Sequence, residues 1–135
     1  MSFWRLYYHI VWATKNRWAL IDGDIEPDLY RYILKKTNDI ECIPHAIGGI
    51  ENHIHMVVSV PPKISISEFV RTIKGGSSHL ANQRKKFGWQ RGFGVLSLGA
   101  KQLDTAVEYV KNQKDRHKRN DLISWLEITD DPQDP

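Results

Sequence analysis

The sequence predicts an α+β fold, a ferredoxin-like (RRM-like) β-α-β-β-α-β sandwich with an antiparallel sheet and an extra C-terminal helix. Segments of period-two alternation and segments of helical periodicity follow one another in this order along the 135 residues. The chain is also 41% hydrophobic, which is enough for one core but short for two. We therefore expect one domain over 1–135, with a core over 3–117 and an acidic polar tail over 121–135.

The first half of the chain supplies a strand, a helix and two further strands. Residues 4–13 alternate between two faces, as a strand does. Residues 27–41 show helical spacing, and Pro27 suits the first turn of a helix. Residues 44–50 and 53–60 then form two strands joined by a tight connection. The two faces of the first strand are Leu6, Tyr8, Ile10 and Trp12, and Tyr7, His9, Val11 and Ala13.

The second half supplies a helix, a strand and a terminal helix. Ser65 and Glu68 match a capping box that begins a helix reaching Leu80, although Gly75-Gly76 is expected to weaken or kink it. Residues 89–98 follow as the fourth strand. Residues 103–113 form the last helix, with an apolar stripe of Leu103, Ala106, Val107 and Val110.

Two histidines on the third strand are the first candidate site. Alternation turns Ile54, Met56, Val58 and Val60 toward the helices and leaves His53 and His55 on the open face, roughly 7 Å apart. Such a pair can converge on one metal ion, and it can equally be two packed imidazoles. Tyr109 and Gln113 share one helix face, and a terminal helix lying on the open face would bring them to the histidines. Tyr109 can also be an aromatic on a core-facing stripe.

The other histidines and the cysteine are given no chemical role. His9, His45, His79 and His117 do not pair with one another at ligand spacing. Cys42 is interpreted as a small, half-buried residue at a strand entrance, and a single cysteine fits a reducing, cytoplasmic location. No apolar run approaches the ~20 residues that cross a bilayer, so we expect no membrane partner.

Basic residues dominate the body of the chain. Residues 1–120 carry 19 basic and 11 acidic side chains, whereas 121–135 holds five acidic ones and no Lys or Arg. Between Arg71 and Arg91 there are six basic residues and no acidic one, and a second basic cluster spans 111–119. Such clusters favour a polyanion such as nucleic acid, although a solvated helix face produces the same pattern.

Five blocks in this order resemble the small single-tyrosine transposases of the insertion sequence 200/605 type, members of the HUH (His-hydrophobic-His) endonucleases. The similarity spans roughly residues 3–117. The blocks are residues 13–17, residues 52–55 with 60–63, residues 74–78, residues 89–94, and residues 109–113. The segment after Gln113 is only loosely similar, and neither it nor the acidic tail is expected to touch the nucleophile or the ligands.

The resemblance implies a metal-dependent tyrosine endonuclease and strand transferase acting on single-stranded DNA at mobile-element ends. It implies Tyr109 as the nucleophile that forms a 5′-phosphotyrosine, and His53, His55 and Gln113 as ligands of a divalent metal. Mg²⁺ or Mn²⁺ suits the function, although imidazole also accepts zinc, cobalt or nickel. It further implies a homodimer whose sites can be shared between subunits, and DNA ends that form hairpins.

Substrate DNA is expected to meet basic, hydroxyl and aromatic side chains. The candidates for phosphate contacts are Lys74, Ser77, Ser78, Arg84, Lys85 and Lys86, and Trp89 or Phe93 can stack bases if exposed.

Other functions stay open from the sequence. One is an inactive or domesticated single-stranded DNA-binding relic. Another is a related enzyme that processes repetitive palindromic elements. An RNA-binding domain of the RRM type ranks last, because two histidines stand where such a sheet carries exposed aromatics.

Overall fold

Four antiparallel strands form one sheet in the order β2-β3-β1-β4. The structure is a computed structural model, and it describes residues 2–129. The strand order and the element order are those of the predicted ferredoxin-like sandwich. The strands are β1 (Tyr7–Ala13), β2 (Ile43–Ile50), β3 (His53–Ser59) and β4 (Gly94–Leu98).

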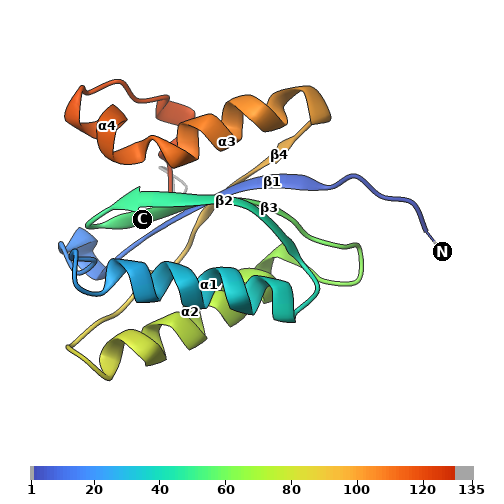
Figure 1. Ribbon diagram of the computed structural model, residues 1–135. Helices are drawn as coiled ribbons and strands as arrows, with labels where there is room; N and C mark the ends of the chain where they lie inside the picture. Colours follow the sequence, from blue (N-terminus) through green and yellow to red (C-terminus); the bar gives the residue numbers. More distant parts are fainter. Residues whose placement is uncertain (1, 130–135) are drawn as a thin grey trace.

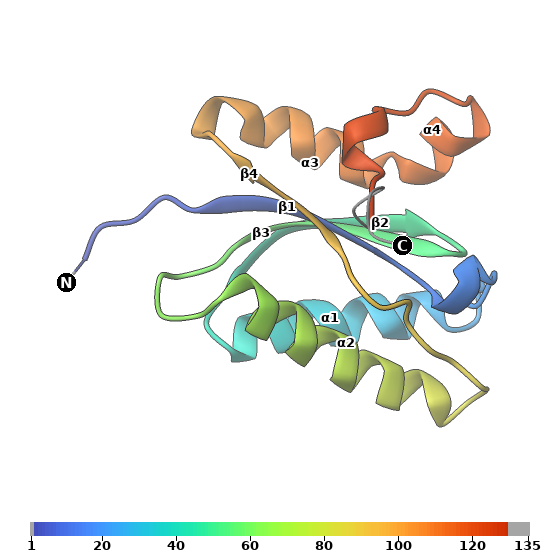
Figure 2. The same ribbon diagram turned by 180° about the vertical axis from the view of Figure 1, so that it is seen from behind.

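Helices cover both faces of this sheet (Figure 1). One layer holds α1 (Glu26–Asp39) and α2 (Ile66–Asn82). The other holds α3 (Leu103–Lys111) and α4 (Gln113–Lys118), which cover the face predicted to be open. Figure 2 shows the same layers from behind, with β4 at the edge of the sheet. The terminal helix therefore lies where the histidines of β3 point.

The core divides along the two faces of β3, as alternation predicts. Ile54, Met56 and Val58 join the main apolar cluster under α1 and α2. Val57 points the other way and packs with Ala106 and Val110 of α3. The Cys42 thiol is more deeply buried than predicted, and burial raises its pKa to about 11.

A glycine in β2 allows α3 to lie directly on the sheet. A Cβ on Gly48 would stand 2.1 Å from the carbonyl oxygen of Val110. No side chain fits in that space, so the close approach of α3 depends on glycine at this position.

The predicted kink in α2 is wrong. The helix runs unbroken from Ile66 to Asn82, and the Ser65 hydroxyl caps its first turn by accepting from Glu68 N. A Cβ on Gly76 would stand 1.8 Å from the Tyr32 hydroxyl, so this glycine serves the contact between α1 and α2. Helix packing outweighs the low helix propensity of glycine here.

The fourth strand is shorter than predicted. Residues 89–93 leave the sheet, and Trp89 keeps only an isolated bridge to Thr14. The Lys74 ammonium donates to the carbonyl oxygens of Gln90 and Gly92, at 2.9 and 2.6 Å. These bonds turn the two carbonyl groups toward α2, while Gln90 N still donates to Ala13 O of β1 at 2.8 Å.

Candidate metal and tyrosine site

Strand β3 places two buried histidines side by side on the α3 face. The rings of His53 and His55 lie 4.9 Å apart, and neither side chain is accessible to solvent by more than a few per cent. His53 Nδ1 lies 2.8 Å from Asn52 Oδ1, an atom that only accepts. His53 Nδ1 therefore donates to Asn52 Oδ1, and this bond fixes the orientation of the ring, with Nε2 directed at Glu127.

A third histidine, His9, contacts the ring of His55. The β1–β3 register pairs Val11 with His55, so His9 points to the same face, and its Nε2 lies 2.9 Å from His55 Nδ1. Burial, and then the neighbouring His55, lower the pKa of His9 to about 3. His9 is thus neutral and fixes the orientation of the His55 ring, as partners of ligating histidines do.

Helix α3 brings Tyr109 to the histidines. Its ring is fully buried with its centroid 5.8 Å from that of His55, edge to face. The helix ends at Lys111, and Asn112 leaves helical geometry before α4 begins at Gln113. The predicted single helix over 103–113 is thus two helices. Gln113 still lies behind the tyrosine, with Nε2 donating to Tyr109 O at 3.4 Å.

Two residues that the sequence analysis left aside complete the cluster. His117 Nε2 lies 3.0 Å from Gln113 Oε1 and 3.4 Å from Glu127 Oε1. Glu127 lies 3.2 Å from both His53 Nε2 and His55 Nε2. Donor atoms of His53, His55, His117 and Glu127 all lie within 4.8 Å of one another.

The prediction that the acidic tail stays clear of the site is therefore wrong. Glu127 accepts a hydrogen bond from the Tyr109 hydroxyl, and Ile123 N donates to that hydroxyl at 3.1 Å. Leu126 and Thr129 are buried as the segment crosses the site. Three further acidic residues of the predicted tail, Asp130, Asp131 and Asp134, lie outside the described residues.

The electrostatics of the cluster keep Glu127 ionised and Tyr109 protonated. Burial alone would raise the pKa of Glu127, but the contacts with His53, His55 and Tyr109 outweigh it and hold that pKa well below its usual range. Burial and the hydrogen bond to Glu127 raise the pKa of Tyr109 to about 12. A phenol in this state is a weak nucleophile.

The donor set fits a divalent metal ion. The buried Nε2 of His53 makes no hydrogen bond within residues 2–129, although it lies 3.2 Å from a carboxylate oxygen. Two atoms that both carry electron pairs can lie this close only with a metal ion or a proton between them. Imidazole nitrogens with a carboxylate are ligands of Zn²⁺, Mn²⁺ and Co²⁺. Gln113, the predicted third ligand, reaches the group through His117.

Two of the three missed residues left a signal in the sequence, but each signal was too weak alone. His9 falls on the alternating set of the first strand that shares a face with the histidines. His117 stands one helical turn after Gln113. Glu127 left none, because it follows an irregular segment whose path no periodicity predicts.

The six residues predicted to contact phosphate differ in their burial and in their ion pairs. Ser77 is buried, with its hydroxyl donating to Ile73 O at 2.6 Å, and it presents no surface to DNA. Arg84 and Lys85 form ion pairs with Asp28 and Asp22. Lys86 is exposed, Ser78 is half-buried, and Lys74 holds the 89–93 segment.

Comparisons with known proteins show which sequences this chain is similar to. A family model described as "Transposase IS200 like" matches residues 2–113. The transposase for insertion sequence element IS200 of Salmonella typhimurium is 28% identical over 137 residues, covering 90% of this chain and 85% of that protein. The ISDra2 transposase TnpA of Deinococcus radiodurans is 24% identical over 124 residues, covering 84% and 87%.

Solved structures share the fold. A crystal structure from Deinococcus radiodurans R1 superposes with a TM-score of 0.66 at 20% identity, covering 83% of this chain and 93% of that one. A REP-associated tyrosine transposase bound to a REP hairpin gives 0.66 at 21% identity, covering 90% and 76%. Among the described residues, no helix is long and apolar enough to span a membrane.

Proposed function

The chain belongs to the IS200-like transposase family, and we propose that it cleaves and rejoins single-stranded DNA at mobile-element ends through a 5′-phosphotyrosine intermediate. One observation carries the proposal. The Tyr109 hydroxyl, the paired histidines of β3 and a carboxylate meet in one buried cluster. A tyrosine beside a candidate metal site suits nucleophilic attack on a phosphodiester.

The bond changes are balanced without another reactant. The Tyr109 oxygen attacks the scissile phosphorus and its proton passes to solvent. A bond forms between tyrosine and the 5′ phosphate, and the bond to the 3′ oxygen breaks. That oxygen takes up a proton and leaves as a 3′ hydroxyl. Because the phosphotyrosine keeps the energy of the broken ester, a second 3′ hydroxyl can reverse the step without ATP.

His53 and His55 would hold the metal, with Gln113, His117 or Glu127 supplying the remaining donors. When bound, a divalent ion there supplies polarisation of a phosphoryl oxygen. Asn52 and His9 fix the two rings through their Nδ1 atoms. We propose Mg²⁺ or Mn²⁺ for the reaction, although this donor set binds the softer transition metals more tightly.

Glu127 gives the site a closed resting state. Its carboxylate occupies the space between the histidines and Tyr109, where the anionic phosphate of a substrate must approach. Tyr109 is wholly buried in this arrangement, and its raised pKa keeps the phenol protonated. The segment 123–129 therefore has to move before DNA can reach the tyrosine.

We also propose that the protein works as a homodimer. Excision of an element requires two cuts, and one chain carries one such tyrosine. In this structure Tyr109 lies on the histidines of its own chain, so a single chain can assemble the site.

An adduct assay tests the proposal. The protein is incubated with Mn²⁺ or Mg²⁺ and a fluorescent single strand that carries its own element's end, then run on a denaturing gel. We expect a slowly migrating adduct that disappears with EDTA and with Tyr109→Phe. DNA retention without any adduct, in either metal, would favour a binding-only protein.

A further inference from the structure

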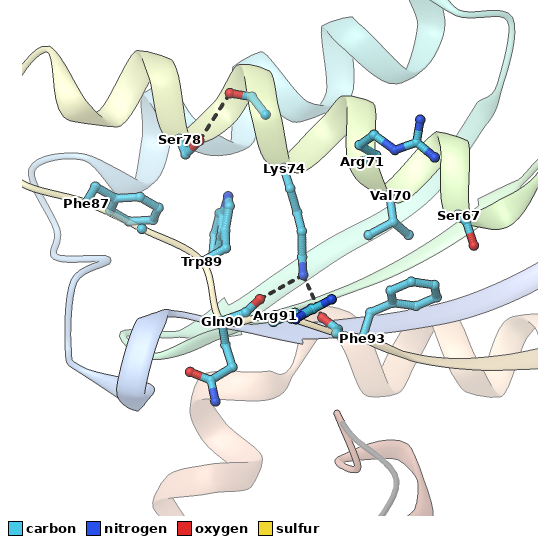
Figure 3. Close-up of a pocket in the computed structure, with 13 residues that line it drawn as sticks. Ser67, Val70, Arg71, Lys74, Ser78, Phe87, Trp89, Gln90, Arg91 and Phe93 are labelled. Carbon is cyan, nitrogen blue, oxygen red and sulfur yellow. Dashed lines mark hydrogen bonds between the residues drawn. The ribbon is translucent and has the colours of Figure 1, made fainter. Parts of the chain in front are cut away.

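A second concave site lies on the far side of the sheet from the histidines. A cavity of about 620 Å³ opens between α2 and residues 87–93 (Figure 3). Its volume is in the range of sites that hold a small ligand. Phe87, Trp89 and Phe93 line it on one side, and Val70 and the stem of Lys74 line it on the other.

The aromatic wall is held in place. Trp89 Nε1 donates to Ser77 Oγ at 3.0 Å, and the Trp89 ring packs edge to face on Trp12 and Phe87. Lys74 fixes the backbone at Gln90 and Gly92, as described above. The aromatic side chains are therefore already ordered, so a flat ligand can pack on them at little cost in side-chain conformational entropy.

The rim of the cavity is cationic and lacks acidic partners. Arg71 and Arg91 are exposed, and neither makes an ion pair or hydrogen bond with another described residue. By contrast, the nearby Arg84 is neutralised by Asp28 of α1. No Asp or Glu occurs anywhere from residue 69 to residue 103. The site is thus complementary to an anion that also carries an apolar, flat group.

We propose that this cavity binds an unpaired nucleotide of the element's DNA, away from the cleavage site, with the base on the aromatic wall and the phosphate on Arg71 and Arg91. Base stacking on aromatic side chains within a basic groove is the usual mode of single-strand binding. The identification of the polymer as DNA rests on the proposed function.

The same segment connects the cavity to the catalytic face. The Gln90 side chain points away from the cavity and accepts from Asn16 N at 2.8 Å (Figure 3). Gly92 lies beneath Thr129 of the segment that closes the site. Residues 90–92 therefore lie between the cavity and the segment 123–129.

Gly75 provides a way to fill the cavity. It lines the cavity on an exposed turn of α2, and a Cβ there would meet no other atom within 4 Å. Gly75→Leu thus introduces a bulky side chain without a clash and with better helix propensity. Gly75→Ala is the matched control, because it strengthens the helix and leaves the cavity open.

The test compares two probes in EDTA by fluorescence anisotropy. One is a labelled short oligothymidylate, and the other is an abasic strand of the same length and charge. We expect the wild-type protein and Gly75→Ala to bind the thymidylate roughly 5- to 150-fold more tightly than the abasic strand, the range for a stacked base. Gly75→Leu is expected to lose this preference while it keeps its affinity for the abasic strand.

Arginine variants test the phosphate contact. Arg71→Ala with Arg91→Ala should weaken both probes and lower the salt dependence of binding, whereas Lys86→Ala, outside the cavity, should change it less. If Gly75→Leu keeps the wild-type preference for thymidylate, the proposal is overturned. The adduct assay on the wild-type protein separates the two proposals. If the cavity proposal fails and the proposed function holds, the wild-type protein still forms the metal-dependent adduct.

Discussion

The Tyr109 hydroxyl donates a hydrogen bond to the carboxylate of Glu127, which lies eighteen residues further along the chain. The same carboxylate lies 3.2 Å from both histidines of β3. One acidic side chain therefore links the proposed nucleophile to the proposed metal ligands. It also lies between them and solvent, which is the basis for the closed resting state proposed above.

Glu127→Gln should weaken metal binding by the DNA-free protein. The substitution replaces a charged donor with a neutral amide, and loss of such a group typically costs 10–100-fold in affinity. Titration calorimetry with Mn²⁺ or Zn²⁺ measures the change. Glu108→Gln is the control, because Glu108 is exposed and pairs with Arg116 outside the cluster. Equal affinities for the two variants would remove Glu127 from the ligand set.

Cleavage should occur within one chain. Tyr109 lies against its own His55, so a mixture of Tyr109→Phe and His55→Ala proteins should give no more adduct than either alone. The denaturing gel with labelled DNA provides the readout. Adduct restored by mixing would show that α3 reaches the histidines of a partner subunit.

Gly48→Ala should destabilise the fold and disturb the site. Its Cβ would overlap the carbonyl oxygen of Val110, so α3 must lift from β2, at a cost of about 1–3 kcal/mol. Adduct formation should fall as well, because α3 carries Tyr109. Gly75→Ala, with open space around its Cβ, should instead stabilise by about 0.5–1 kcal/mol. Urea unfolding distinguishes the two, and a Gly48→Ala protein as stable as wild type would contradict the packing described.

The metal-free protein should lose stability as the pH falls below 6.5. His9 has a pKa of about 3 when folded, so the unfolded chain binds a proton between these values that the folded chain refuses. Burial also lowers the pKa values of His55 and His117, in the same direction. Unfolding by urea in EDTA across this range should give a shallower slope for His9→Gln. An unchanged slope would mean that His9 is not buried as a neutral ring.

The fold and half of the cluster follow from local patterns in the sequence. Alternation along residues 53–60 gives the outward direction of His53 and His55, and helical spacing gives the face of Tyr109. Local patterns do not predict where the helices and strands end, because tertiary contacts determine those positions. Lys74 binds the carbonyl groups of Gln90 and Gly92 where the fourth strand was predicted, and Tyr32 accounts for Gly76 in an unbroken helix.

Glu127 illustrates what local patterns cannot supply. It lies in an irregular segment whose position depends on distant contacts. A Cβ on Gly94 would stand 1.9 Å from Ile128 O, and Arg17 donates to Thr129 Oγ1 at 3.0 Å. These contacts join residues far apart in the chain, so no pattern within the segment reveals them.

The most direct measurement is the mass of the peptide that carries the DNA. The adduct is digested with nuclease and trypsin, and fragments are sequenced by tandem mass spectrometry. Trypsin releases residues 102–111, in which Tyr109 is the only tyrosine. We predict a nucleotide phosphate on Tyr109 in this peptide, formed only when metal was present. A nucleotide on Tyr7, Tyr8, Tyr30 or Tyr32, or on none, would contradict the assignment of Tyr109 as the nucleophile.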